Sequence, residues 1–237
     1  KFYGIIMKTI KSSKNVVLIV VSHTDDETIG MGGTIARHLR NGDEIFALSM
    51  TDGVGSRSSF DSKKKEARLE AALQASKVLG FKWLENLNYQ DNKLDSVPLL
   101  KIIKEIEKVK DLIKPNLIYT HSSADLNIDH RVVNQAVLTS FRPQPDEVWN
   151  EIRTFEISSS TDYGHKSVTN YFTPNLYIDI TDYWDSKLEA LKKYSMEIRD
   201  YPHSRSYKGI ENLAIHRGNQ VGLKYAESFE VIRKIIR

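Results

Sequence analysis

The sequence contains no cysteine among its 237 residues. Without cysteine the chain cannot form disulfides, and it cannot bind a metal through thiolates. The absence is consistent with a cytoplasmic location, which is our expectation.

Long apolar runs are also missing. No stretch approaches the roughly 20 consecutive apolar residues that a transmembrane helix needs, so we expect no membrane span. The first seven residues lack the apolar core of a signal peptide, and the only early methionine is Met7. We therefore expect residues 1–15 to be an N-terminal extension or a cloning remnant, and we leave residues 1–6 out of the fold argument.

Neither positive nor negative charge is in large excess. The net charge is +3 and is spread along the chain, which argues against a nucleic-acid partner. The run of lysines at 63–65 is more typical of the solvated start of a helix than of a phosphate-binding patch. We find no internal repeat and no clear linker, so residues 1–237 are expected to form a single domain.

The pattern of apolar residues predicts an α/β fold. Residues 16–21 read Val-Val-Leu-Ile-Val-Val, which indicates a strand buried on both faces. Further strands are expected at 45–50, 84–87 and 117–120. Helices are expected at 28–40, 63–79, 99–113 and 128–140. This alternation predicts a Rossmann-like, doubly wound, mostly parallel sheet.

The regular alternation weakens after Phe141, where we expect an elaborated C-terminal part. Strands are predicted at 148–157 and 176–180, and helices at 182–194 and 207–217. The polar segment 158–173 is expected to be a loop near the site.

A first polar cluster follows the first predicted strand. His23, Asp25, Asp26 and Glu27 place one imidazole and three carboxyl groups within five positions. In open parallel sheets, ligands bind beyond the carboxyl ends of the strands. A bound dication would compensate the crowded negative charge. The alternative is a polar loop that begins a helix, with Asp25 or Asp26 as its cap.

A second cluster follows the strand at 117–120. It comprises His121, Asp125, Asn127, Asp129 and His130. Because both clusters follow strands of one parallel sheet, we expect them to converge at the same edge. The alternative is that Asp129 and His130 merely begin a helix.

Taken together, the clusters supply a set of nitrogen and oxygen ligands. His23, Asp26 and His130 would give three ligands to Zn²⁺ and leave a fourth position for water. That pattern is typical of catalytic rather than structural zinc sites.

The two motifs resemble those of a known family. Residues 23–27 are similar to the His-Pro-Asp-Asp-Glu motif of the LmbE/PIG-L family of zinc-dependent N-acetylglucosaminyl de-N-acetylases. Residues 125–130 resemble its second motif, and the segments 32–34, 51–53 and 79–80 are also similar. The tail at 217–222 resembles the bacterial, sugar-modifying branch, and the likeness extends over roughly residues 16–229.

The resemblance implies a cofactor and roles for individual residues. His23, Asp26 and His130 would bind one zinc ion per chain, or another divalent metal. Asp25 would be the general base, and Asp129 a carboxylate beside a ligand.

The sequence departs from the family pattern at two positions. Thr24 replaces the usual proline, which we expect to have little chemical consequence. Asn127 replaces a histidine that assists the oxyanion or protonates the leaving group in many members. We expect His121, rather than His203, to take over this role. In the competing interpretation, Asn127 itself donates a hydrogen bond and Asp25 carries every proton.

Substrate contacts are also predicted. Arg57, Arg142 and Arg205 are the candidate substrate-binding residues, and Arg68 is a further arginine of this kind. Tyr163 and Trp149 are the aromatic candidates for flanking a sugar ring. The alternatives are that the arginines are ordinary surface charges and that the aromatic residues belong to the core.

The expected function is hydrolysis of the N-acetyl group of an N-acetylated amino sugar, releasing acetate. The substrate would be a sugar nucleotide or glycan precursor, or a thiol-linked glucosamine. A nucleotide-binding module is a rival interpretation, but the glycine-rich segment 30–33 lacks the GxGxxG spacing. A second rival is a regulatory module that binds sugar or nucleotide and retains metal without turnover. The oligomeric state stays open.

Overall fold

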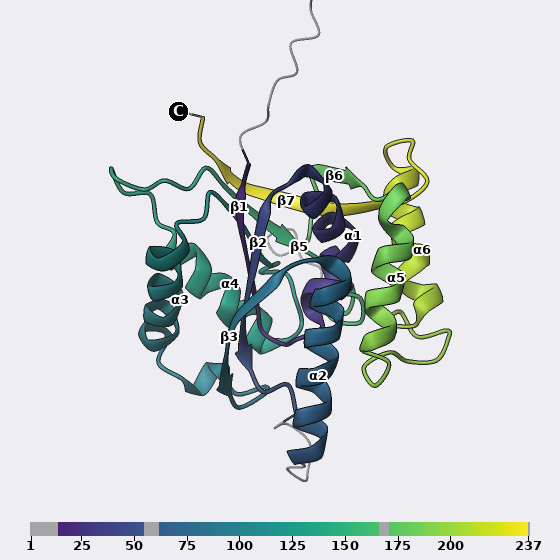
Figure 1. Ribbon diagram of the computed structural model, residues 1–237, viewed down its shortest axis with the longest axis horizontal. Coiled ribbons are helices and arrows are strands. Elements are labelled where there is room, and N and C mark those ends of the chain that lie inside the picture. The colour runs from purple at the N-terminus through teal and green to yellow at the C-terminus, as the bar shows by residue number, and fades with distance from the viewer. Residues whose placement is uncertain (1–13, 55–61, 166–170, 237) are drawn as a thin grey trace, which may run out of the picture.

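The computed structural model describes residues 14–54, 62–165 and 171–236, whose strands form one seven-stranded sheet (Figure 1). The strands are β1 (Val16–Val21), β2 (Glu44–Thr51), β3 (Lys82–Tyr89), β4 (Leu117–His121), β5 (Glu151–Phe155), β6 (Leu176–Asp179) and β7 (Ala226–Lys234). The helices are α1 (Asp26–Asn41), α2 (Ser62–Leu79), α3 (Leu99–Ile113), α4 (Ile128–Ser140), α5 (Trp184–Lys193) and α6 (Tyr207–Asn219). Short 3-10 turns lie at Leu94–Ser96 and Thr181–Tyr183.

The strand order is β3-β2-β1-β4-β5-β7-β6. All pairs from β3 to β5 are parallel, whereas β7 runs antiparallel to both β5 and β6. The first five strands thus follow the strand order of a Rossmann-like sheet. The predicted fold class is confirmed, and β6, β7, α5 and α6 make up the C-terminal elaboration.

Helices cover both faces of the sheet. In Figure 1, α3 and α4 lie on one side, and α1, α2, α5 and α6 lie on the other. Alternate residues of β1 enter the two cores: Val17 and Ile19 face the α1 side, while Leu18 and Val20 face α3 and α4. This explains the unbroken apolar sequence of β1, because neither of its faces meets water.

Two strands, β3 and β5, differ markedly in length from their predictions, and one strand was not predicted. β3 extends beyond the expected 84–87. β5 is shorter than the expected 148–157, because its parallel partner β4 offers only five residues for pairing. No strand was predicted at the position of β7.

The topology brings the two polar clusters together. β1 and β4 are parallel neighbours, so the loops after them leave the same edge of the sheet. α1 and α4 begin in these loops. Within the described ranges, no helix is both long and apolar enough to cross a membrane.

Candidate metal centre

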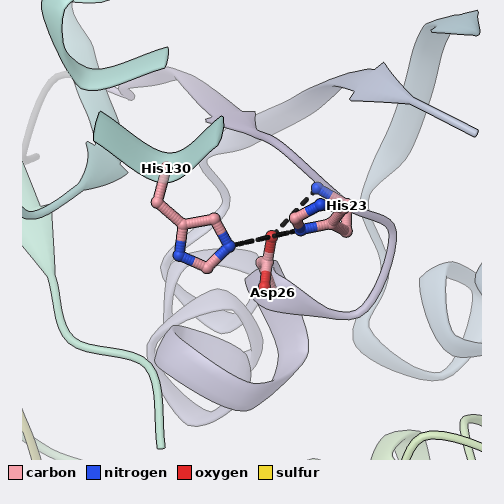
Figure 2. Close-up of side chains that lie close together, drawn as sticks. All are labelled: His23, Asp26 and His130. Carbon is pink, nitrogen blue, oxygen red and sulfur yellow. Dashed lines mark hydrogen bonds and ion pairs between the residues drawn. The ribbon is translucent and has the colours of Figure 1, made fainter. Parts of the chain in front are cut away.

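Three buried side chains meet where β1 and β4 end (Figure 2). His23 lies in the loop after β1, Asp26 is the first residue of α1, and His130 lies in the first turn of α4. In Figure 2, the two imidazoles approach the Asp26 carboxylate from either side.

The spacing of these atoms suits a zinc ion. His23 Nδ1 lies 3.1 Å from Asp26 Oδ2 and 3.2 Å from His130 Nε2, and His130 Nε2 lies 3.3 Å from Asp26 Oδ2. Ligand atoms at zinc-bonding distance in a tetrahedral site lie about 3.3–3.4 Å apart. Two imidazoles and one carboxylate are also the ligand types that zinc accepts. The residues present therefore fit the metal that the motifs predict.

The electrostatics of the centre favour a positive charge. Burial alone would lower the pKa of His130, but the carboxylates of Asp26 and Asp125 outweigh it and raise this pKa to about 9. Burial would raise the pKa of Asp26, but the three neighbouring histidines hold it well below its usual range. A cation between these groups would replace the proton that they otherwise favour.

Further carboxylates face the outer nitrogens of the two imidazoles. Asp125 Oδ2 lies 3.1 Å from His130 Nδ1, and Asp91 Oδ1 lies 3.0 Å from His23 Nε2. Asp129 Oδ2 is 3.5 Å from the same His23 nitrogen. Such outer carboxylates orient metal-binding imidazoles and raise their basicity.

Asp129 also joins α4 to the loop after β3. Its two carboxylate oxygens accept backbone hydrogen bonds from Asn92 (2.7 Å) and Leu94 (2.9 Å). His23, Asp91 and Asp129 form a second group with metal-ligand spacing. Because both Asp129 oxygens already accept amide hydrogens, we interpret Asp91 and Asp129 as residues that orient the His23 imidazole.

Asp25 lies beside the ligand triangle in an unusual backbone conformation. Its φ of 146° is rare for a residue with a side chain, and its amide donates to Glu27 Oε2 at 3.0 Å. Arg68 Nη2 donates to Asp25 Oδ1 at 2.7 Å and also pairs with Glu197 through Nη1. Burial raises the pKa of Asp25, and Arg68 opposes this rise. Arg205 Nη1 lies 3.6 Å from Asp25 Oδ2.

His121 packs behind the centre. Its ring stacks on His130 with centroids 3.9 Å apart, and its Nε2 accepts a 2.9 Å hydrogen bond from the Ser22 amide. Burial lowers the pKa of His121 to about 3, which keeps the ring neutral. With Nε2 engaged as an acceptor and the whole side chain buried, His121 lies against His130 and is not open to solvent.

Asn127 and His203 each make a local hydrogen bond to the backbone. Asn127 caps α4, and its side chain accepts the Asp129 amide hydrogen at 2.8 Å. His203 Nδ1 accepts the backbone hydrogen of Arg205 at 3.0 Å, and its ring lies edge-on to Tyr163. The loop that contains His203 thus also positions Arg205 beside Asp25.

Other predicted contacts are not brought to the site. Arg142 is exposed beyond the last turn of α4, whereas His130 is in the first. A rise of 1.5 Å per residue separates these two positions by about 18 Å. Trp149 is fully buried against Phe141 in the α3–α4 core, so it cannot flank a sugar. Arg57 lies outside the described residues.

Several site residues were missed from the sequence. Asp91 follows β3, so the rule that located the first two clusters also applied to its Gln-Asp-Asn loop. Tyr194, at the end of α5, donates from its hydroxyl to Glu27 Oε1 at 2.9 Å. No local sequence pattern pointed to Tyr194 or to Glu197, whose carboxylate lies beside Arg68. Both residues come from the C-terminal part, which only tertiary packing brings to the β1–α1 turn.

The chain is similar to known proteins. A family profile described as "PIG-L: GlcNAc-PI de-N-acetylase" matches residues 18–141. A diacetylchitobiose deacetylase from Thermococcus kodakarensis is 27% identical over 228 residues, which cover 91% of this chain and 82% of the relative. A 4-oxalmesaconate hydratase from Pseudomonas putida is 25% identical over 197 residues, covering 74% and 71% of the two chains. The solved N,N'-diacetylchitobiose deacetylase from Pyrococcus horikoshii shares the fold, with a TM-score of 0.74 at 24% identity over 92% of this chain and 84% of its own.

Proposed function

Because the chain belongs to the PIG-L family, we propose that it is a zinc-dependent hydrolase that removes the N-acetyl group from an N-acetylated amino sugar and releases acetate. The observation that carries this proposal is the buried ligand triangle of His23, Asp26 and His130 with the Asp25 carboxylate beside it. The similarity to a diacetylchitobiose deacetylase supports an amino-sugar substrate. A cytoplasmic sugar nucleotide or glycan precursor is the class that we favour.

Asp25 is the proposed general base. Zinc, when bound, supplies Lewis acidity and lowers the pKa of water. Arg68 holds Asp25 Oδ1, while no described residue donates a hydrogen bond to Asp25 Oδ2. The second oxygen is therefore available to take a proton from the attacking water and to return it to the departing amine.

Asn127 is the proposed oxyanion donor, in place of our expectation for His121. The Asn127 side-chain oxygen is engaged as the cap of α4, which leaves its amide N–H groups for a substrate oxygen. His121 cannot offer Nε2, because this atom accepts the Ser22 amide hydrogen. Arg205, beside Asp25, is the substrate-binding candidate that the geometry supports.

Metal content and acetate release test the proposal. The purified protein should bind about one Zn²⁺ per chain, since the three ligands form one site. The zinc-loaded protein should release acetate from a panel of N-acetylhexosamine nucleotides and N-acetylated oligosaccharides. Loss of both properties in His130→Ala is expected. Full zinc occupancy in that variant would refute the ligand assignment.

The same panel separates the rival functions. A metal-retaining regulatory module would bind zinc and a sugar or nucleotide without releasing acetate. Because one of the relatives is a 4-oxalmesaconate hydratase, the same protein is also tested on 4-oxalmesaconate. Hydration of its double bond is followed by the loss of ultraviolet absorbance. Hydration without acetate release would replace the proposed reaction.

A further inference from the structure

Helix α1 is broken just after the residues that serve the metal centre. Met31 has the non-helical dihedral angles φ −147° and ψ 24°. The break separates a short first segment, which begins with Asp26, from the remainder of the helix. The amides of Gly33 and Thr34 beyond the break donate to the two carboxylate oxygens of Glu227 at 3.0 and 2.7 Å.

A buried lysine bridges the two segments. Lys187 of α5 donates from Nζ to Glu227 Oε1 at 2.6 Å and to the carbonyl oxygen of Ile29 at 2.9 Å. Ile29 precedes the break, whereas the amides held by Glu227 follow it. The side chains of Lys187 and Glu227 are only 3% and 4% exposed. The C-terminal elaboration thus fixes both sides of the break through one ion pair.

The glycine-rich sequence at 30–33 makes this arrangement possible. A Cβ atom on Gly30 would lie 2.5 Å from the Phe155 ring, and one on Gly33 would lie 2.7 Å from the Ile180 side chain. Both distances are below normal van der Waals contact. The glycines therefore let the broken helix approach β5 and the end of β6, which accounts for a motif that the nucleotide-binding interpretation left unexplained.

We propose that Lys187 and Glu227 are positioning residues for the metal centre. His23 and His130 are carried by the β1 loop and by α4, whereas Asp26 begins the segment that this ion pair orients. Fixing the break sets the place of the Asp26 carboxylate relative to the two imidazoles and strengthens metal binding. The inference rests on the proposed metal site and adds residues that contact no ligand atom.

Zinc affinity of the full chain tests this role. Zn²⁺ alone is titrated against a chromophoric chelator, with wild type, Lys187→Met and Glu227→Gln compared. We expect weakening on the order of 10- to 100-fold for Lys187→Met, as for other outer-shell changes, and a smaller loss for Glu227→Gln, which keeps one acceptor oxygen. Wild-type affinity in Lys187→Met overturns the proposal.

Lys110→Met is the matched control. Lys110 Nζ also contacts one carboxylate, Glu147 Oε1 at 2.6 Å, and one carbonyl at a helix end, Ser140 at 3.1 Å. This pair lies at the far end of α4. We expect its loss to leave zinc affinity unchanged, and an equal loss in both lysine variants overturns the proposal.

A double variant separates positioning from the cost of an unpaired buried charge. Lys187→Met with Glu227→Leu removes both charges together, so neither is left buried without its partner. It still leaves the amides of Gly33 and Thr34 without their acceptor, so zinc affinity should stay low. Wild-type affinity in this variant overturns the proposal. Failure of the wild-type chain to bind zinc would instead refute the proposed function and this inference together.

Discussion

At the scale of single residues, the turn between β1 and α1 concentrates both backbone strain and charge. Asp25 holds a φ of 146°, a conformation that costs on the order of 1–3 kcal/mol and persists only when its surroundings enforce it. Here the enforcing contacts are the hydrogen bond from its amide to Glu27 and the ion pair with Arg68. The strained turn directs Asp25 to the proposed proton transfer and the following carboxylate, Asp26, to the candidate metal centre.

Substitution of the proposed base should separate metal binding from turnover. Asp25→Asn keeps the shape of the side chain and an oxygen for Arg68, but it cannot accept a proton. We expect unchanged zinc content and a fall in kcat on the order of 10²- to 10⁴-fold. Steady-state kinetics of protein with measured zinc content provide the check. A near-normal kcat at neutral pH would show that another group is the base.

Single substitutions should also identify the oxyanion donor. Asn127→Ala is expected to lower kcat by roughly 10²- to 10³-fold, as when one preorganised donor is lost. His121→Ala should weaken zinc retention instead, because its ring supports His130. His203→Ala should have a small effect on kcat. Comparing kcat at equal zinc content decides among them, and a severe loss confined to His203→Ala would transfer the role to that residue.

At the scale of elements, the far end of α1 is held by a buried hydrogen-bonded chain. His38 lies between Asp43 Oδ2, 2.6 Å from its Nδ1, and the Tyr119 hydroxyl, 2.9 Å from its Nε2. Arg153 Nη1 in turn donates to the Tyr119 oxygen at 2.5 Å. A neutral imidazole satisfies this chain, since it can donate to Asp43 and accept from Tyr119.

This chain predicts a loss of stability in acid. Burial lowers the pKa of His38, and nearby Arg153 and Arg37 add to the effect, while Asp43 opposes it. The unfolded chain therefore binds more protons at this site, so its contribution is complete above pH 6.5, roughly the unfolded pKa, and is lost as pH falls. Urea unfolding between pH 7.5 and 5 should show the advantage of wild type over His38→Gln shrinking. Parallel pH curves would contradict the assignment.

At the scale of the whole molecule, the candidate metal centre joins the two layers of helices. α1 and α4 lie on opposite faces of the sheet (Figure 1), and their first turns supply Asp26 and His130. A metal held by both would link the layers at one edge. Binding would then stabilise the fold as well as serve the reaction.

Removal of zinc should accordingly lower the melting temperature. A ligand that binds only the folded state at 100 times its Kd adds about 2.7 kcal/mol of stability. Thermal unfolding with and without a chelator measures the difference, and added zinc should restore it. His130→Ala is the control, because chelation should barely change its melting temperature. An identical shift in that variant would place the stabilising metal elsewhere.

Several features of this protein follow from patterns within short segments of the sequence. The apolar run of β1 predicted a strand buried on both faces, and the β-α alternation predicted the parallel sheet. The position of both polar clusters after parallel strands predicted that His23, Asp26 and His130 would meet. These inferences succeed because side-chain period and strand direction are encoded within short segments.

Features that depend on contacts between distant segments became known only from the three-dimensional structure. Arg142 and Arg205 were equally plausible substrate-binding residues from the sequence. Of these two, only Arg205 lies beside Asp25 in the structure. β7 was not predicted, partly because its sequence contains the charged residue Glu227. In the structure Glu227 is buried, and Lys187 and the amides of α1 compensate its charge. A buried charge is stable only with partners, and here those partners lie about 40 and 190 positions away along the chain. Contacts between residues so far apart along the chain leave no local sequence pattern, so they could not be predicted before the fold was known.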